Sequence, residues 1–430
     1  MKRKIIVLVL VLFTGLNVFL ALNRHSHSKP HSYHGELWAD RGGYFVYLPA
    51  ATYYSFDARK LPGGLDTLTG RGFKLDTLSG RVITKYTAGV AMLQSPFYLL
   101  GHGLAKLSGW TTAPYGPLDH VLVDIAASTL LSLGLLLLFL NLRQRYGEQL
   151  SGWLLLAIYA GSNLYFYTIG DPGMSHVYSF FLFSLLLFLV DRWYQRPDRS
   201  LTLVCIGITA GLILLVRPTN AVFLIISPFV NATDLRTGWR RIASHISAKR
   251  VVLLLLPAAL VWLPQLLYWH YAFGSAITWP YVDEGFTNWA APEFARFWFA
   301  PNNGLFTYTP LYVLVILAAV VAWVHKDLVT ACTSLAAFLA ISYLGSSWWV
   351  WHFGCGFGSR TMVEYLALFA FPLASWTRWS IQRWGRWLPA MTYILLAAYN
   401  LKLVYSYGNC WFFDEWDWQA FGHLLFGPTK

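Results

Sequence analysis

Charged residues are scarce in this sequence. Of its 430 residues only 12% are Asp, Glu, Lys or Arg, whereas 56% are hydrophobic. Soluble globular domains carry about 25% charged residues. The shortage therefore excludes an ordinary soluble domain and indicates a polytopic membrane protein.

Cysteine is rare as well, and internal repeats are absent. The four cysteines, Cys205, Cys332, Cys355 and Cys410, form no CxxC or Cys/His spacing. This excludes the usual sulfur-ligated zinc sites. The chain shows no fixed-period repeat or low-complexity tract, which argues against a transporter built from two similar halves.

Long apolar runs are what the sequence has in abundance. A spanning helix needs about 20 apolar residues, and roughly eleven segments qualify, two of them short. They are 4–22, 119–141, 151–169, 174–193, 201–216, 219–231, 251–270, 307–324, 329–345, 362–377 and 388–406. We interpret the first as an uncleaved span rather than a signal peptide, because its run of about 18 apolar residues exceeds the usual signal length.

The distribution of basic residues predicts which loops face the cytoplasm. With the N-terminus inside, the inner loops 143–149, 191–199, 236–250, 325–327 and 378–386 are all rich in Lys and Arg. This is the positive-inside pattern, and it explains the net charge of +12 without nucleic-acid binding. The pattern requires 201–216 and 219–231 to cross separately; the alternative is one helix broken at Pro218 or a re-entrant element.

The first outer loop, 23–118, is about 95 residues long, far beyond an ordinary connection. Within it, 88–107 is apolar but interrupted by polar positions, so we expect a helix lying in the membrane interface; an additional span is the alternative. The organisation expected is one domain over 1–430, with the first span at 4–22, this loop, the remaining spans over 119–406 and an outer tail at 407–430.

Acidic residues recur on the predicted outer face. Asp40 follows the first span in ADRGGYFVYLPA, Asp171 lies in the turn GDPGMSH, and Glu284 follows Asp283 in WPYVDEGF. Two further acids, Glu364 and Asp124, lie at or within a span. Ionisable groups near a membrane are costly and are functional hypotheses by default, although each acid alone is also compatible with a solvated or ion-paired loop residue.

Cations and aromatic residues share this face. Lys85, Arg217 and Arg360 lie in outer segments, and Arg presents a planar fork suited to phosphate. His176 and His352 are compatible with proton transfer or with structural hydrogen bonding. The aromatic loops, including WWVWHF at 348–353, fit either an interfacial belt or a platform that stacks on sugar rings.

These residues together resemble the GT-C superfamily of integral membrane glycosyltransferases, most closely the bacterial relatives of protein O-mannosyltransferases and of the lipid A aminoarabinose transferase. The resemblance covers almost the whole chain. It runs through ADRGGYFVYLPA, KYTAGVAMLQSPFYLL, GDPGMSHVYSFF, LLVRPTN, PQLLYWHYAFGS and SSWWVWHFGCGFGSRTMVEYLALFAFPLA. It implies an all-α, GT-C-like bundle in the bacterial inner membrane, with the N-terminus cytoplasmic and the active site periplasmic.

The resemblance also implies an activity: inverting transfer of a hexosyl or pentosyl unit from a polyprenyl-phosphate carrier to a hydroxyl on a protein, lipid or glycan. Asp40 would be the general base, and Asp171 with His176 a second acidic site. The implied phosphate-binding residues are Arg360, Arg217, Lys85 and Arg41. The implied sugar- or acceptor-binding residues are Tyr44, Trp349, His352 and Glu284.

Two features depart from the better-known family members. Asp40 is followed by Arg41 rather than by a second acid, and Asp171 lies in GDP rather than in a paired-acid motif. A divalent cation, Mg²⁺ or Mn²⁺, held by Asp40 and Asp171 is therefore left open. The vicinal arginine would lower the pKa of Asp40 or contact the carrier phosphate, and the sequence does not separate these roles.

Three other functions remain as alternatives: a lipid or glycan transporter, a polysaccharide polymerase or ligase, and a non-catalytic envelope assembly protein. Membrane lipids are expected partners in every case, and nucleic acid in none. Cys355 and Cys410 both fall on the predicted oxidising side, so a disulfide between them is a further hypothesis.

Overall fold

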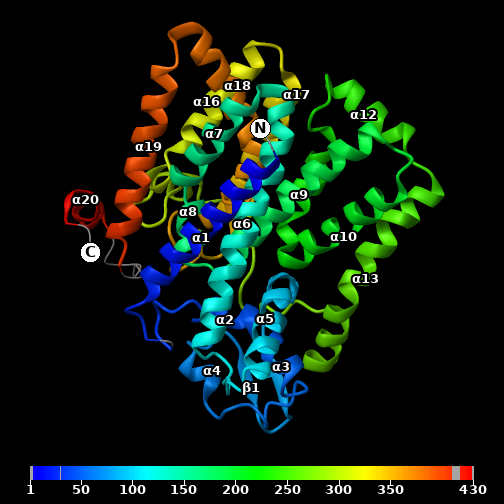
Figure 1. Ribbon diagram of the computed structural model, residues 1–430, viewed down its shortest axis with the longest axis vertical. Coiled ribbons are helices and arrows are strands. Elements are labelled where there is room, and N and C mark those ends of the chain that lie inside the picture. The colour runs from blue at the N-terminus through cyan, green and yellow to red at the C-terminus, as the bar shows by residue number, and fades with distance from the viewer. Residues whose placement is uncertain (1–2, 30, 409–416, 429–430) are drawn as a thin grey trace.

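The computed structural model describes residues 3–29, 31–408 and 417–428. Long helices form a bundle, and the first outer loop folds against one end of it (Figure 1). Six described helices are long and apolar enough to cross a membrane. They are α1 (Arg3–His25), α6 (Pro117–Tyr146), α9 (Ser175–Gln195), α13 (Ala248–Phe273), α17 (Leu328–Ser347) and α19 (Trp387–Ser406). The protein is thus a multi-pass membrane protein, as the composition predicts.

Shorter apolar elements complete the bundle. They are α10 (Ser200–Val216), α16 (Leu311–Val324) and a segment made of η1 (Pro218–Asn220), α11 (Ala221–Ile226) and η2 (Ser227–Phe229). Six long helices with these shorter ones do not confirm the expected eleven spans. The chain turns at Arg217, whose backbone is extended at φ −154° and ψ 114°, because Pro218 cannot continue a helix.

Three of the expected spans are interrupted helices. The run 151–169 is divided at Gly161 between α7 (Glu148–Ala160) and α8 (Leu164–Ile169). The run 307–324 is broken before Pro310, after α15 (Leu305–Tyr308). The run 362–377 begins with η3 (Arg360–Met362) and continues as α18 (Leu366–Trp384). Hydropathy averaged over a long window does not detect such breaks, because the few polar residues at them stand within mostly apolar runs.

The centre of the bundle is formed by α6 and α9. A Cβ placed on Gly134 of α6 would lie 3.1 Å from the Cα of Phe181 in α9, so the two backbones approach closely there. Phe183 of α9 stacks on Phe223 of α11 with ring centroids 3.6 Å apart. In contrast, Leu255, Leu260 and Leu267 of α13 are more than half exposed, as expected of a lipid-facing helix.

The first outer loop contains more structure than an all-α fold predicts. It holds α2 (Asp40–Phe45), α3 (Tyr47–Thr52), α4 (Leu65–Leu68), the antiparallel strands β1 (Lys74–Asp76) and β2 (Arg81–Ile83), and α5 (Gly89–Leu107). The strands correct the all-α expectation locally. The expected helix at 88–107 is present as α5, and its leucines 99, 100, 104 and 107 are more than half exposed, which suits an interfacial position.

Polar groups of α13 fasten this loop to the bundle. The backbone N–H of Ala88 donates to the buried side chain of Gln265 at 2.8 Å. The hydroxyl of Tyr268 accepts from the N–H of Thr84 at 2.8 Å and donates to the carbonyl of Val82 at 3.1 Å. These bonds fix the segment 82–88 and with it Lys85 and Tyr86.

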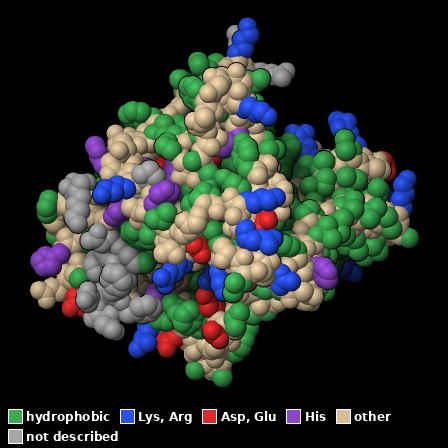
Figure 2. Space-filling model, turned by 90° about the horizontal axis from the view of Figure 1, so that it is seen from below, with side chains coloured by type: hydrophobic (Ala, Val, Ile, Leu, Met, Phe, Trp, Pro, Cys, Tyr) green, Lys and Arg blue, Asp and Glu red, His purple; other side chains and the backbone are tan. Residues whose placement is uncertain are grey.

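The remaining described helices are α12 (Leu235–Ser244), α14 (Phe294–Phe299) and α20 (Trp418–Phe426). The basic helix α12 lies at the opposite end of the bundle from the outer loop (Figure 1). This arrangement agrees with the predicted separation of 236–250 from 23–118. From the outer-loop end, acidic and basic side chains lie close together near the middle, and hydrophobic side chains cover one flank (Figure 2).

Candidate active site

Asp40 is the first residue of α2, and its position depends on an unusual backbone turn. Ala39 has φ 50° and ψ −120°, a sparsely populated conformation. Its N–H donates to the carbonyl of Thr69 at 2.8 Å, and a Cβ on Gly72 would lie 1.8 Å from the carbonyl oxygen of Ala39. Only glycine at position 72 therefore allows this close approach.

Two side chains contact the Asp40 carboxylate. The Tyr86 hydroxyl donates to Oδ1 at 2.5 Å, and an Arg360 Nη lies 3.4 Å from Oδ2. The Asp40 side chain is 36% exposed, so part of the carboxylate remains accessible. We call Asp40, Lys85, Tyr86 and Arg360 the outer carboxylate site.

Asp40 is ionised at neutral pH. Burial by itself would raise its pKa, but Arg360 opposes this most strongly, followed by the Tyr86 hydrogen bond, Lys85 and Arg41, and the net result is a lowered pKa. The side chain is consequently a weak base that is fully charged at neutral pH, and Arg41 contributes least of these four groups.

Arg41 and Asp171 form an ion pair beside this site. An Arg41 Nη lies 2.5 Å from Asp171 Oδ1, and the guanidinium also donates to the carbonyls of Tyr33 at 2.7 Å and Trp38 at 3.1 Å. The Arg41 side chain is buried. Its donors thus tie the first loop to the turn after α8.

Lys85 pairs with Glu284, and its ammonium lies 5.3 Å from the ring centroid of Tyr281. The Tyr86 and Tyr281 rings meet edge to face, with ring centroids 6.3 Å apart.

A second cluster contains Arg217, His176 and Glu364. Arg217 donates to Glu364 Oε1 at 3.2 Å and lies 3.1 Å from His176 Nδ1. His176 Nδ1 is itself 3.0 Å from Glu364 Oε2. The structure therefore brings Asp40, Lys85, Glu284 and Arg360 together, with the Arg217–His176–Glu364 cluster next to them.

The expected sugar-binding residues are placed less uniformly. Tyr44 is buried beside Tyr86 with ring centroids 4.4 Å apart, and it lies within electrostatic range of Asp40, Arg217 and Arg360. Trp349 is about half exposed. His352 is buried, and burial lowers its pKa to about 4, so its imidazole is neutral at pH 7.

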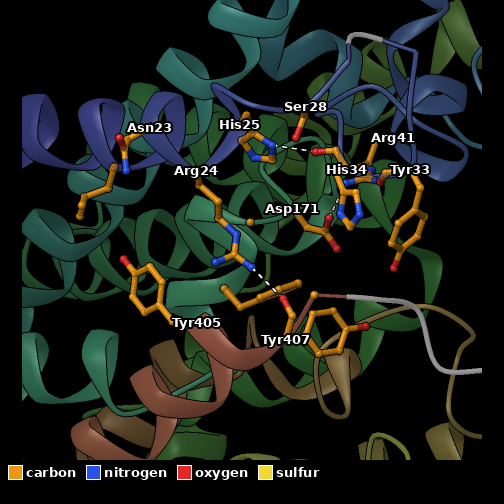
Figure 3. A pocket seen from close by; sticks show the side chains of 14 residues that line it. Asn23, Arg24, His25, Ser28, Tyr33, His34, Arg41, Asp171, Tyr405 and Tyr407 are labelled. Carbon is orange, nitrogen blue, oxygen red and sulfur yellow. Dashed lines mark hydrogen bonds and ion pairs between the residues drawn. The ribbon is translucent and has the colours of Figure 1, made fainter. Parts of the chain in front are cut away.

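A polar cavity of about 340 Å³ adjoins the Arg41–Asp171 pair. Arg24 at the end of α1 extends toward Tyr407, and Asp171 and Arg41 meet at the opposite side (Figure 3). An Arg24 Nη donates to the carbonyls of Val404 at 3.2 Å and Tyr407 at 3.4 Å. The Asp171 side of the site thus faces a space that Asp40 does not line.

The Asp40 and Asp171 carboxylates do not offer the free ligand pair that a metal needs. Each is engaged by an arginine, which competes directly with a cation. Three other side chains could hold a metal ion: His25, Glu36 and Asp124 are all buried, and their ligand atoms lie within 4.8 Å of one another. No sequence motif groups these residues, because they come from three separate segments.

Tyr86, which donates to Asp40, was not among the residues predicted for the site, and Glu364, one of the acids noted in the sequence, binds Arg217. Tyr86 directly follows Lys85 in the quoted KYTAG, and that adjacency was the available signal. Among the cysteines, Cys205 and Cys332 are free. The hypothesised disulfide to Cys410 lies outside the described residues, because position 410 does.

Comparison with known proteins supports the fold. The chain is similar to the Archaeoglobus fulgidus oligosaccharyltransferase, whose crystal structure is a complex with zinc and sulfate, at TM-score 0.50 and 14% identity. The match covers 91% of this chain and 52% of that one, so the chain spans about half the length of that protein. No family model and no curated protein matches the sequence. The likeness shows a shared fold and leaves the family unassigned.

Proposed function

We propose that this protein is an inverting glycosyltransferase that moves a sugar from a polyprenyl-phosphate carrier to an acceptor hydroxyl at the outer, periplasmic face of the membrane. The observation that carries the proposal is the Asp40 carboxylate, held ionised and partly accessible between Tyr86 and Arg360. The likeness to an oligosaccharyltransferase fold supports glycosyl transfer from a lipid-linked donor as the general reaction.

Asp40 acts as the general base in this proposal. It removes the proton of the acceptor hydroxyl while the hydroxyl oxygen forms a bond to C1 of the donor sugar. The bond between C1 and the phosphate oxygen breaks, and polyprenyl phosphate leaves with the electron pair. A single displacement inverts the anomeric centre. A weak base is sufficient in an oxocarbenium-like transition state. There the bond from C1 to the phosphate is largely broken before the acceptor hydroxyl becomes acidic enough to lose its proton.

Arg360 and Lys85 stabilise the phosphate as its negative charge develops. Both cations act on Asp40. Arg360 contacts the carboxylate directly, and Lys85 reaches Glu284, which partly offsets its charge before the donor binds. Arg217 would serve the same anion from the neighbouring cluster. Cations arranged in advance around the leaving group stabilise the transition state more than the ground state.

Arg41 and Asp171 position the base in this proposal. Arg41 is buried, and its guanidinium N–H groups donate to Asp171 and to two backbone carbonyls, so it orders the turn that begins α2. Tyr44, Glu284, Trp349 and His352 are proposed to bind the sugar or the acceptor, with His176 supporting Arg217. No step requires a metal at Asp40 and Asp171.

The test is Asp40→Asn, assayed in purified protein with labelled polyprenyl-phosphate sugar and an acceptor mixture. We expect transfer to fall by about 10²–10⁴-fold, while binding of the donor is retained. Asp57→Asn is the matched control, because Asp57 is a carboxylate of the same loop that pairs only with nearby Arg59.

Full transfer by Asp40→Asn would overturn the assignment of the base. Movement of the lipid-linked sugar across the membrane without transfer, in the wild type, would instead establish a transporter. Retained transfer by Asp57→Asn shows that loss in Asp40→Asn is specific to that carboxylate.

A further inference from the structure

Four ionisable side chains meet in the interior beneath the first loop, apart from the outer carboxylate site. His25 ends α1, Glu36 comes from the loop, and His120 and Asp124 lie one turn apart on α6. Their exposed fractions are 8%, 6%, 6% and 0%. We call these residues the His–carboxylate cluster. Residues four apart on a helix share a face, so His120 and Asp124 present their side chains in the same direction.

The distances within the cluster suit a shared ligand. The ligand atoms of His25, Glu36 and Asp124 lie within 4.8 Å of one another, and His120 Nδ1 lies 2.6 Å from Glu36 Oε2. A tetrahedral zinc ion lies about 2.0–2.2 Å from its nitrogen and oxygen ligands, which places the ligand atoms of His25, Glu36 and Asp124 closer together than 4.8 Å. A small contraction of side chains would therefore bring them to coordination distance. The 2.6 Å contact between His120 and Glu36 is a hydrogen bond and is too short for two ligands of one ion.

Buried polar groups point to such a ligand. The carboxyl of Asp124 is buried with that of Glu36 as its hydrogen-bonding neighbour, and Nε2 of His120 is buried without a partner in the described parts of the chain. Two carboxylates that meet away from water need a proton or a cation between them. A bound cation satisfies both the charge and the lone pairs of Asp124.

The surroundings of His25 fit a metal-bound imidazole. Its Nδ1 lies 2.8 Å from the carbonyl of His34, and its Nε2 lies 3.1 Å from the carbonyl of Ile169. A neutral imidazole has only one N–H, so only one of these contacts is a hydrogen bond. The other nitrogen is then available to coordinate, while the N–H bond to a carbonyl orients the ring, as is usual for ligating histidines.

We propose that His25, Glu36 and Asp124 bind one divalent transition-metal ion, Zn²⁺ by their chemistry, at a site distinct from Asp40 and Asp171, with His120 hydrogen-bonded to Glu36 as a positioning residue. An imidazole with two carboxylates favours zinc over Mg²⁺ or Ca²⁺, which prefer all-oxygen sites.

The ion would fasten the loop that carries Asp40. A Cβ on Gly173 would lie 2.5 Å from the carbonyl oxygen of Glu36 and 2.8 Å from Cβ of Arg41, so Glu36 and Arg41 pack against the same turn. A metal joining Glu36 to α1 and α6 consequently restrains the segment that leads to Asp40. This inference does not depend on the proposed transfer reaction.

The experiment uses the full-length protein, purified without a polyhistidine tag, stripped with a chelator and titrated with Zn²⁺. We expect one equivalent of zinc by elemental analysis and a rise in Tm of at least about 2 °C at saturating zinc. X-ray absorption at the zinc edge should show nitrogen and oxygen ligands that include an imidazole. Asp124→Asn and Glu36→Gln should each weaken zinc binding at least about 10-fold.

Asp119→Asn is the matched control, because Asp119 is a fully buried carboxylate of α6 that pairs with His102 at 2.6 Å outside the cluster. It should retain the zinc. The double variant Asp40→Asn/Asp171→Asn should also retain it, whatever happens to transfer activity.

Three outcomes would overturn the inference: wild-type protein that binds no zinc after exhaustive titration, zinc with only oxygen ligands, or zinc that is lost from the double variant and kept by Asp124→Asn. The measurements on the wild type stand even where a cluster variant fails to fold.

Discussion

Two charged clusters lie only four residues apart along the first loop, and they differ in almost every physical respect. The outer carboxylate site surrounds Asp40 with cations and leaves 36% of its side chain exposed. The His–carboxylate cluster contains no Lys or Arg among its four members and is closed from solvent. The first has an excess of positive charge and suits an anion; the second suits a cation.

This difference matches the two roles proposed for the clusters, reaction at Asp40 and anchoring in the interior. The proposed base needs access and a charge that substrate can reach, and Asp40 is partly exposed. A carboxylate that holds segments together gains from burial, because its interactions are stronger where water is excluded. The same short stretch of chain supplies Glu36 to one cluster and Asp40 to the other.

The largest effect is expected from removing Arg360, the cation that contacts Asp40. Arg360→Gln should lower transfer by about 10²–10³-fold, since it removes a preorganised donor near the leaving phosphate. It should also move the acid limb of the pH–rate profile to higher pH. Arg360 is the strongest influence that lowers the pKa of Asp40, so its loss raises that pKa and protonates the base at higher pH.

The zinc content of Arg360→Gln is the internal control. We expect it to equal that of the wild type, because Arg360 contacts none of the cluster residues in the described structure. A profile whose acid limb stays in place would show that Arg360 does not set the ionisation of Asp40. A loss of zinc would show that the two clusters are one coupled unit.

A second prediction concerns Gly43, whose lack of a side chain lets Tyr86 pack against α2. A Cβ on Gly43 would lie 2.4 Å from the ring of Tyr86 and 2.3 Å from the carbonyl oxygen of Gly72. Gly43→Ala should therefore displace Tyr86 and lower transfer by about 10–100-fold, since small misplacements of reacting groups are costly.

Gly63→Ala is the matched control, because a Cβ there meets nothing within 4 Å. It should leave kcat and zinc content unchanged. Equal activity of the two alanine variants would show that the packing of Tyr86 against α2 does not matter for catalysis.

The sequence predicts the membrane class and much of the site, and the reasons are local. The scarcity of charge and the Lys- and Arg-rich loops follow directly from the physics of the bilayer. A helix at 88–107 was predicted because that stretch is apolar but interrupted by polar positions, and α5 occupies it. Asp40, Lys85 and Arg360 were selected because each stands in an outer segment, where charge is conspicuous beside apolar spans.

The features that the sequence does not predict depend on contacts between residues far apart in the chain. Pairings such as Arg41 with Asp171 and Lys85 with Glu284 join residues more than 100 positions apart. The breaks at Gly161 and Pro310 lie within apolar runs that read as continuous spans. The His–carboxylate cluster is assembled from the end of α1, the loop and α6, and no motif connects those three segments.

The smallest expected effect comes from Tyr86→Phe, which deletes one hydroxyl. The Tyr86 hydrogen bond lowers the pKa of Asp40, although less than Arg360 does. The variant should therefore raise that pKa and shift the acid limb of the pH–rate profile in the same direction as Arg360→Gln, by a smaller amount. Transfer at neutral pH should fall only about two- to tenfold, because the bond is present in both ground and transition states. Tyr54→Phe, in the same loop, is the control and should leave the profile unchanged. A shift larger than that of Arg360→Gln would make the tyrosine, rather than the arginine, the group that holds Asp40 ionised.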